Sequence, residues 1–558
     1  MVAPNFLTKG QQIVPMKYRP KPLVFGIVVL SLIIDKLNVT GAITSFYSLS
    51  KKFDVPIATA SWVLSVYALT IGSFIIVFGK VGDIVGPHNT FVIGSFAMSL
   101  FSLLAATVDE SIYAVIVFRA FQGIAGAALI PSGFAITASY FQGKARFIAL
   151  KLMAAAITGA LGLGVILGGA FDEGSIGYQG LFYFTFAVSF VASVLLYFII
   201  IPVEKTEGHK NLKFKNLDFF GVSLMISGLL LIIVAFTEAA NSWNSPKVYV
   251  TLPVGFVLLI SFFYFELIYL KSYKKKFQNS LPSQQQELTD KPDWRLDTQP
   301  LFPAEILEIP NIKLLLYGIF VVNTCAICLQ SCLVEYFEYI ELDTPIIASV
   351  KILPLSVGAV FGSALFNPKI VKALTLRGTL VIAASVGLGA YIWASRIDYT
   401  VHNNYWKFAF ASQFLTGYSI NMFFVVILSG LMQNTPLHLQ GVVSGVVQTI
   451  AQVGASIGTA VINSIIGSMK YEKGDEAARH RVAKNFQNSL YFMVGLGGSL
   501  VILMLFIKDD KSFLVAKNEN QPGKESNDVE VDSTEVEEES KEIEKESEDI
   551  EEVSNIRS

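Results

Sequence analysis

Long apolar segments recur along the chain, separated by short polar stretches. A helix that crosses a bilayer needs roughly 20 apolar residues, and the sequence contains fourteen segments of about that length. Backbone groups in lipid must bond within their own segment, and the alternation typical of a β-barrel is missing, so each segment is predicted to be a helix. The predicted helices cover residues 22–46, 57–79, 89–108, 111–136, 147–171, 180–201, 218–237, 248–270, 312–334, 346–366, 378–395, 407–431, 440–467 and 487–507.

Basic residues are concentrated in alternate loops. The N-terminal segment and the loops after the second, fourth, sixth, eighth and tenth predicted helices hold 20 Lys and Arg. The loops after the first, third, fifth, seventh, ninth and eleventh hold 4. Because basic loops tend to stay in the cytosol, both termini are predicted to be cytosolic. One segment, Lys470–Lys484, departs from this rule by placing five basic residues on the predicted outside.

Composition agrees with a membrane protein and locates its charge. Of the 558 residues, 53% are hydrophobic and 15% charged, whereas a soluble domain has about 25% charged residues. Residues 508–558 hold 7 basic and 18 acidic groups, a net of −11, and the rest hold 35 and 26, a net of +9. In this tail aliphatic residues recur every seven positions, as at one seam position of a coiled coil, but the second seam position is mostly acidic. This pattern favours a disordered acidic tail over a coiled coil.

Several classes of function find no support in the sequence. No basic soluble domain suits nucleic acid. No P-loop, serine-hydrolase or zinc motif is present, so neither an enzyme nor a cofactor is expected. Cys325, Cys328 and Cys332 share a face of the ninth predicted helix. We interpret these cysteines as three small apolar residues rather than as a soft-metal site, and no metal is expected.

Two charged residues inside predicted helices are candidates for function, because such residues are costly in a membrane. Asp35 lies in the middle of the first helix, where a carboxylate suits a proton or cation site. The alternative is a structural ion pair with Lys36 or Arg119, although neighbours on a helix diverge by about 100° and Asp35 need not pair with Lys36. Arg119 in the fourth helix stays charged. It is predicted to respond to the charge of Asp35, the alternative being a structural staple bonded to backbone carbonyls.

Amide side chains occur on polar faces of several predicted helices. They are predicted to line a wet cavity and contact a substrate, and for each the alternative is an interhelical hydrogen bond. These candidates are Asn38, Gln122, Asn323, Gln330, Gln413, Asn421, Gln448 and Gln452.

Six segments of the sequence form recognisable motifs. They are Gly79-Lys-Val-Gly-Asp83-Ile-Val-Gly86, Arg119-Ala-Phe-Gln122-Gly123-Ile-Ala-Gly126, the glycine-rich stretch 160–169, and residues 217–221, 241–246 and 440–458. Taken together, these segments resemble the Major Facilitator Superfamily, and within it the fungal fourteen-helix drug:proton antiporters. The first is similar to the signature of the loop after the second helix, the second resembles the fourth-helix motif linked to proton coupling, and the third resembles the fifth-helix antiporter motif. The other three are similar to segments of the fourteen-helix members.

Several positions depart from the family pattern, among them Ala160, where the fifth-helix motif has another Gly, and Lys36 beside Asp35. Ile84 and Pro87 stand where the loop signature normally carries cations, and Val165 stands where the fifth-helix motif usually has Pro. These departures bear on how the cytosolic gate is held and on the direction of transport.

The resemblance implies an all-α polytopic membrane protein with two six-helix bundles and an inserted helix pair. The predicted divisions are a cytosolic segment 1–21, a first bundle 22–201, a cytosolic linker 202–217, the inserted pair 218–270, a cytosolic loop 271–311, a second bundle 312–507 and the acidic tail 508–558.

The resemblance also implies alternating-access transport, predicted here as proton-coupled export of a small molecule or drug. Asp35 and Arg119 would carry the proton coupling. The expected partners are a small-molecule substrate, protons and the lipid bilayer; the chain is expected to be monomeric in the plasma membrane, with the vacuolar membrane as the alternative. The gating motifs implied by the resemblance comprise Gly79, Asp83, Gly86, Gly164, Gly168 and Gly169.

Two other functions stay open. The chain looks closest to a fungal group that includes aminotriazole-resistance and boron-efflux permeases and a low-affinity ammonium transporter. A facilitator or importer of ammonium or borate is therefore an alternative. A non-transporting membrane sensor that signals through the acidic tail is a third.

Overall fold

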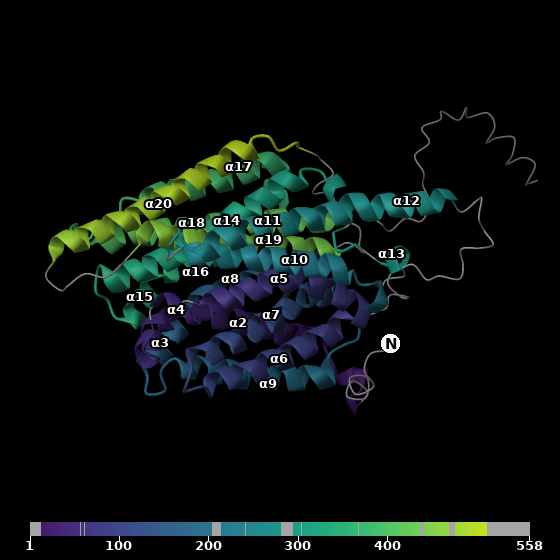
Figure 1. Ribbon diagram of the computed structural model, residues 1–558, viewed down its shortest axis with the longest axis horizontal. Helices are drawn as coiled ribbons and strands as arrows, with labels where there is room; N and C mark the ends of the chain where they lie inside the picture. Colours follow the sequence, from purple (N-terminus) through teal and green to yellow (C-terminus); the bar gives the residue numbers. More distant parts are fainter. Residues whose placement is uncertain are drawn as a thin grey trace, which may run out of the picture. The chain divides into compact units, whose positions relative to one another are not determined.

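The long elements of the structure are all helices. The computed structural model describes residues 13–55, 57–60, 62–203, 214–239, 242–280, 294–298, 300–302, 304–365, 368–435, 440–467 and 475–509. Within these residues fourteen helices are long and apolar enough to cross a membrane. The predicted all-α polytopic fold is confirmed (Figure 1).

The spanning helices follow the order of the predicted ones. In the first half they are α2 (Lys21–Gly41), α5 (Trp62–Val85), α6 (Pro87–Ala106), α7 (Ile112–Tyr140), α8 (Gly143–Glu173) and α9 (Gln179–Ile199). An additional pair follows, α10 (Phe219–Ala239) and α11 (Pro246–Tyr264). The second half holds α14 (Ile312–Tyr339), α15 (Pro345–Lys351) with α16 (Leu353–Leu365), α17 (Pro368–Ala394), α18 (Phe410–Asn434), α19 (Gln440–Ile466) and α20 (Glu476–Met504).

Short elements join them. They are η1 (Met16–Tyr18), η2 (Ile43–Ser45), α3 (Phe46–Lys52), α4 (Ile57–Ala60), η4 (Phe214–Asn216), the π-helix η5 (Phe265–Tyr269), α12 (Leu270–Ser280), α13 (Trp294–Asp297), η7 (Ala304–Glu308) and the π-helix η8 (Tyr405–Ala409).

Several helices run further than the apolar pattern predicts, among them α5, α11 and α20. Helix α5 continues past residue 79 and ends at Val85, because Lys80 is buried in the protein and the turn comes only at Gly86, whose φ is +102°. Helix α20 begins at Glu476, where the side chain of Asp475 accepts a hydrogen bond from Ala478 N (2.9 Å) and caps the helix. The helix that starts with α11 continues through η5 and α12 to Ser280.

The two halves use the same set of helix pairings. Counting six spans in each half, the second packs on the fourth (α5 with α7, α16 with α18) and the third on the fourth (α6 with α7, α17 with α18). The first packs on the fifth (α2 with α8, α14 with α19), and the third and the first both pack on the sixth (α9 and α20). The halves are therefore two copies of one six-helix arrangement, which is the organisation of many transporters built from repeats.

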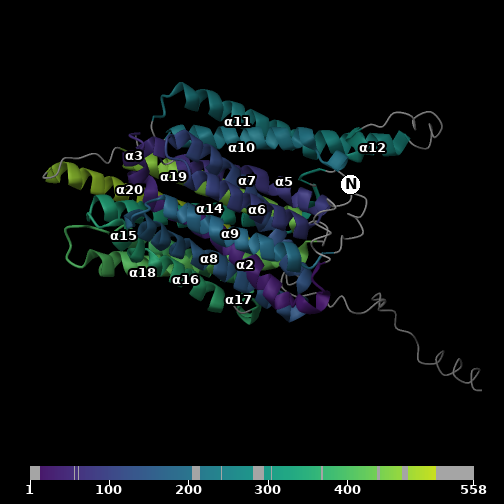
Figure 2. The same ribbon diagram turned by 90° about the horizontal axis from the view of Figure 1, so that it is seen from below.

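Two interfaces join the halves. Helix α5 packs on α19, and α8 packs on α15 and α16, so the second span of each half meets the fifth span of the other. The additional pair, α10 and α11, contacts the bundles through α10, which touches α5 and α19 (Figure 2). Large apolar side chains remain exposed on the outer helices, among them Val191 (57%) and Val257 (60%), as expected for surfaces that face lipid.

Candidate functional site

Asp35 lies at the centre of the first half with no exposed surface. Its carboxylate accepts a hydrogen bond from the hydroxyl of Tyr67 on α5. Its other oxygen lies 3.1 Å from Nζ of Lys36. The two neighbours therefore do form an ion pair, because the long Lys36 side chain bends back to the carboxylate. This is the geometry of the alternative that the sequence left open.

Arg119 of α7 is also fully buried and is bonded elsewhere. Its Nε donates to the backbone oxygen of Val63 (2.9 Å) and its Nη1 to Oε1 of Gln122 (2.9 Å). Its Nη2 has no hydrogen-bond partner within the described residues. The bond to Val63 joins α7 to α5, which is the structural role that the sequence left as the alternative. A direct Arg119–Asp35 ion pair, which the sequence left open, is absent from the described residues.

Tyr67 connects the two charges. Its hydroxyl bonds to Asp35, and the guanidinium of Arg119 lies over its ring at 4.5 Å from the centroid, a cation–π distance. A change in the charge of Asp35 would therefore act on Arg119 through an intervening side chain. The sequence reasoning missed Tyr67, because a Tyr in an apolar helix gives no polar signal.

Asn38 and Gln122 complete this cluster. Oε1 of Gln122 accepts from Arg119 and from Nδ2 of Asn38 (3.1 Å), while its Nε2 donates to Ser102 Oγ (3.2 Å). All of these side chains are buried. The two amides thus bond to each other across α2 and α7. We call Asp35, Asn38, Tyr67, Ser102, Arg119 and Gln122 the Asp35 cluster.

Two glycines let α7 approach the Asp35 cluster. A Cβ added at Gly126 would lie 2.6 Å from the Tyr67 hydroxyl and 2.7 Å from Oδ1 of Asp35. A Cβ added at Gly123 would overlap the Thr70 hydroxyl and lie 2.6 Å from the backbone oxygen of Tyr67. A side chain at Gly126 would therefore displace the hydrogen bond between Tyr67 and Asp35, whereas one at Gly123 would collide with the backbone of α5.

The glycines of α8 face two different helices. A Cβ at Gly164 or Gly168 would collide with α2, at Leu37 and Gly41. The glycines at 162 and 169 face the second half: a Cβ at Gly162 would lie 2.6 Å from Ser356 Cβ, and one at Gly169 would lie 2.8 Å from Ser349 Oγ. The fifth-helix motif therefore supports close packing both within the first half and between the halves.

The candidate amides of α14 and α18 are mostly bonded to backbone. Gln413 Nε2 donates to Lys351 O (3.0 Å), and Asn421 Nδ2 donates to Ala359 O and to the Ser363 hydroxyl. Asn323 Nδ2 donates to a carbonyl of its own helix (3.0 Å). Gln330 reaches across to Leu161 O on α8 (3.4 Å). Gln413 and Asn421 are fully buried, so they have the geometry of interhelical bonds.

Gln448 and Gln452 of α19 differ from these amides. Both are half-buried, and neither side-chain amide makes a hydrogen bond within the described residues. Gln452 lies at the interface between the halves, because a Cβ at Gly72 of α5 would lie 3.1 Å from Gln452 Cβ. Among the predicted substrate contacts, these two therefore leave the whole amide unbonded within the described residues, whereas Asn38, Gln413 and Asn421 leave only the buried amide oxygen without a partner.

The loop signature spans the end of α5 and the turn that follows it. Gly86 leaves the helix with a positive φ, and a Cβ there would lie 2.8 Å from the imidazole of His88. Nδ1 of His88 accepts from Val203 N (3.2 Å), just after α9. Gly79 and Asp83 lie in the last turns of α5. The turn after α5 thus contacts the segment that follows α9, where the chain leaves the first half.

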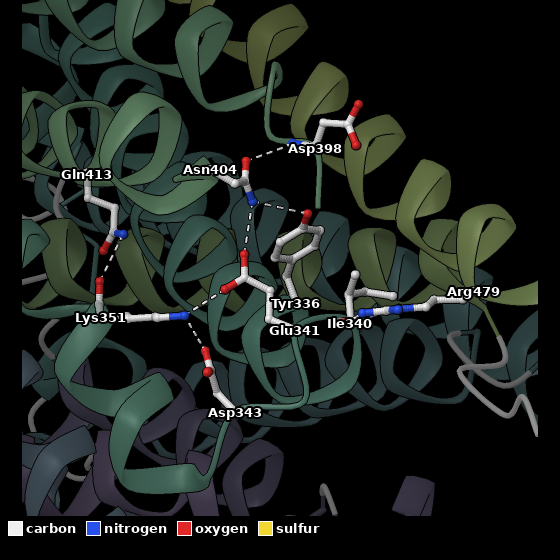
Figure 3. A network of polar contacts seen from close by, with 9 residues as sticks. All are labelled: Tyr336, Ile340, Glu341, Asp343, Lys351, Asp398, Asn404, Gln413 and Arg479. Atoms are coloured by element: carbon white, nitrogen blue, oxygen red, sulfur yellow. Dashed lines mark hydrogen bonds and ion pairs between the residues drawn. The ribbon is translucent and has the colours of Figure 1, made fainter. Parts of the chain in front are cut away.

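A network at the end of α14 was not predicted from the sequence. Nζ of Lys351 on α15 bonds to Glu341 Oε2 (2.6 Å) and to Asp343, and Asn404 donates to Glu341 Oε1 (2.9 Å) (Figure 3). On the other side of the network Arg479 of α20 donates to Ile340 O (2.6 Å). Glu341, Asp343 and Asn404 sit in short loops, where a sequence pattern does not indicate which charges meet. We call Glu341, Asp343, Lys351 and Asn404 the Glu341 network.

A second group of polar contacts lies beside α3. Lys52 Nζ and Gln179 Nε2 both donate to Asp109 Oδ1, at 2.6 and 2.9 Å. The hydrogen bond and charge of Lys52 hold the pKa of Asp109 below its usual range. Burial raises the pKa of the neighbouring Tyr178 to about 12.

The three cysteines are fully buried in α14. In the described part of the chain no group of three or more His, Cys, Asp or Glu side chains is placed to hold a metal ion.

Comparison with known proteins places the chain in a family. The sequence profile of the Major Facilitator Superfamily matches residues 28–459. An efflux pump of Aspergillus terreus is 23% identical over 515 residues, covering 88% of each chain. The low affinity ammonium transporter of Saccharomyces cerevisiae is 32% identical over 215 residues, covering 37% of this chain and 41% of that one.

A solved structure agrees on the fold. The crystal structure of a human organic anion transporter matches with a TM-score of 0.56 at 12% identity, over 87% of this chain and 99% of that one. The profile covers most of the chain, the relatives include fungal efflux pumps and transporters, and the helices repeat in two halves. The chain belongs to the Major Facilitator Superfamily of transporters.

Proposed function

We propose that the protein exports a small molecule across the plasma membrane in exchange for protons, by alternating access of its two halves. The observation that carries the proposal is the fully buried carboxylate of Asp35, which lies within reach of both Tyr67 and Lys36. A buried carboxylate changes charge when it binds a proton, and its partners must then rearrange. The similarity to fungal efflux pumps supports the outward direction.

In this proposal Asp35 takes up and releases the proton, and Tyr67 passes the change in its charge to Arg119. Arg119 staples α5 to α7, and α5 packs on α19 of the other half. Protonation would thus act on one of the two interfaces between the halves. Gln448 and Gln452, on that same helix α19, would contact the substrate.

The test uses purified protein in proteoliposomes with an imposed pH gradient. A growth screen of a deletion strain against toxic solutes first supplies a transported compound. Asp35→Asn is expected to abolish the dependence of flux on the gradient while the protein stays folded, and Asp109→Asn, an exposed carboxylate, is the matched control. Unchanged proton dependence in Asp35→Asn would exclude the role of Asp35.

A second candidate is uncoupled or inward movement of ammonium or a similar small solute. The 32% identity with an ammonium transporter favours it, and so does Lys36, whose charge already balances Asp35 in an ion pair. The direction of flux under an imposed pH gradient separates the two candidates, since an exchanger needs the gradient and a facilitator follows the solute alone.

A further inference from the structure

Two acidic side chains meet inside the additional helix pair, where α11 and η5 run alongside α10 (Figure 2). Asp218, which directly precedes α10, has no exposed surface, and Glu266 in the π-helix η5 is 4% exposed. A Cβ added at Gly221 would overlap Oδ2 of Asp218 and lie 2.9 Å from Oε1 of Glu266. The two carboxyl groups are therefore neighbours, within hydrogen-bonding distance of each other. We call them the carboxyl pair.

Backbone N–H groups account for one oxygen of each carboxyl group. Oδ1 of Asp218 accepts from Gly221 N (2.8 Å) and so caps the N-terminus of α10. Oε1 of Glu266 accepts from Leu301 N (3.0 Å), in the segment between α13 and η7. The other two oxygens, Oδ2 of Asp218 and Oε2 of Glu266, are buried and have no hydrogen-bond partner within the described residues. Because unpaired buried acceptors are unfavourable, a donor is missing at this point.

The side chains around the carboxyl pair are apolar. The ring of Phe220 packs edge-on against Phe265, with centroids 4.9 Å apart, and Phe263 packs in the same way against Phe302, at 5.7 Å. Leu301 has no exposed surface. In such surroundings two adjacent carboxyl groups do not both ionise, and one of them retains a proton.

Two lysines face the carboxyl pair without bonding to its unpaired oxygens. The charges of Lys80 on α5 and Lys274 on α12 are both attracted to the pair. Lys80 is also attracted to Asp83 and Glu305, and Lys274 Nζ donates to Thr298 O (2.6 Å). The lysines are thus shared with other partners, and they balance a pair that carries one negative charge better than a pair that carries two.

A metal ion suits this site less well than a proton. Ca²⁺ takes about six to eight oxygen ligands and Mg²⁺ about six, whereas the carboxyl pair offers two unpaired oxygens. The N–H groups of Gly221 and Leu301 also point at the pair and would repel a cation. One proton, in contrast, satisfies both oxygens, because the protonated group donates to the ionised one.

We propose that Asp218 and Glu266 share one proton, forming a proton-binding site separate from Asp35. The proton joins α10 to η5, and the bond from Leu301 adds the segment that leads through η7 into α14 of the second half. A π-helix such as η5 often marks a functional site. When the proton leaves, two like charges remain in apolar surroundings, and η5 is expected to separate from α10. Occupancy of the site requires neither flux nor the proposed role of Asp35.

The proton is observable in the infrared spectrum of the purified full-length protein, since a protonated carboxyl group has a carbonyl band that a carboxylate lacks. The spectrum of the wild type minus that of Glu266→Gln, at neutral pH, is expected to contain this band. The band should be lost in the variant whichever residue holds the proton, because Asp218 alone beside an amide ionises. Glu238→Gln near the other end of α10 is the matched control, since Glu238 pairs with Lys247 (3.7 Å) and is ionised. A difference spectrum with carboxylate bands only would overturn the proposal.

The pH dependence of thermal unfolding in detergent gives a second readout. A proton bound by the folded pair stabilises the protein at low pH, and this stabilisation is lost as pH rises past the point where the folded pair releases it. Between about pH 6 and about pH 9 the melting temperature of the wild type and of Glu238→Gln is expected to fall by several degrees more than that of Glu266→Gln, whose amide donates at any pH. If Glu266→Gln does not fold, Asp218→Asn tests the same loss. Equal slopes in all variants would contradict the proposal, as would stabilisation of the wild type, but not of Glu266→Gln, by added Ca²⁺.

Discussion

Gly126 allows α7 to pack closely against the hydrogen bond that Tyr67 donates to Asp35. Gly126→Ala would place a methyl group 2.6 Å from the Tyr67 hydroxyl. Such overpacking costs about 1–3 kcal/mol, so we expect a lower melting temperature and loss of proton-dependent flux. Gly26→Ala on the open side of α2, with nothing within 4 Å, is the control. Equal behaviour of the two variants would show that the Tyr67–Asp35 contact tolerates displacement.

Tyr67 offers a second test at the residue scale. Tyr67→Phe keeps the ring beneath Arg119 and removes only the hydroxyl that donates to Asp35. A hydrogen bond to a charged group contributes about 1.5–3 kcal/mol, so its loss is expected to lower the melting temperature and to weaken the dependence of flux on the imposed pH gradient. Unchanged proton dependence in proteoliposomes would mean that Tyr67 has no part in coupling.

The sequence singled out Asp35, Asn38, Arg119 and Gln122, and the structure brings all four together. A charge or an amide inside an apolar segment is conspicuous because of its cost in lipid. The partners that organise them, Tyr67 and the backbone of Val63, gave no such signal. Which polar groups bond to one another depends on helix rotation, and helix rotation is set by packing that a single segment does not encode.

Among the elements, α8 has two functions in packing. Its glycines at 164 and 168 face α2, whereas Gly162 faces Ser356 of α16 across the interface between the halves. Gly162→Ala is expected to push α8 from α16 and so disfavour the state in which they touch. Ser356→Gly removes the colliding side chain, so the double variant should recover transport.

A double-mutant cycle on flux and melting temperature measures this coupling. Gly159 provides the control, because a Cβ there would meet only Val360 Cγ2, at 3.3 Å. Additive effects of Gly162→Ala and Ser356→Gly, without recovery, would place the cost of Gly162→Ala elsewhere in α8.

The Glu341 network stabilises a broken helix. The tenth span consists of α15 and α16, which are separated at Ile352. Lys351, the last residue of α15, binds this helix to the loop after α14. Lys351→Met leaves two carboxylates without their cation, and we expect a loss of about 2 kcal/mol in unfolding free energy. Lys313→Met, at an exposed position on α14, is the control in thermal unfolding in detergent. A melting temperature equal to that of the control would show that the network adds no stability.

At the scale of the molecule, hydropathy predicted the number and order of the spans, since lipid imposes one dominant constraint. Their ends were less predictable. The apolar pattern stops at residue 79, but α5 continues because Lys80 is buried against protein rather than placed in water. The pairing of helices, the same in both halves, also lies beyond a pattern of single segments, because it depends on contacts far apart in the chain.

The ends of the second half meet at one end of the bundle. Asn311, before α14, bonds to the backbone of Lys508 after α20 (3.0 and 2.8 Å), and Arg377 of α17 pairs with Asp509 (3.3 Å). The predicted tail begins at this point, and its residues after Asp509 lie outside the described part of the chain. If the termini are cytosolic, this end of the bundle faces the cytosol.

The sidedness of the molecule is testable without removing native cysteines, because Cys325, Cys328 and Cys332 have no exposed surface. An impermeant maleimide on intact cells is expected to label His402→Cys, in the exposed loop after α17, and Ala477→Cys, at the start of α20. Gln142→Cys, before α8, should react only after permeabilisation, and the wild-type chain not at all.

The second of these positions decides how the basic segment 470–484 is to be understood. Its five basic residues favour the cytosol, whereas the count of spans places it outside. Arg479 already donates to Ile340 O, so part of this charge is engaged in the protein and is less available to interact with the membrane surface. We therefore expect Ala477→Cys to label together with His402→Cys. Labelling of Ala477→Cys only after permeabilisation would mean that one of α18 and α19 does not cross the membrane, and that the charge rule prevails over hydropathy there.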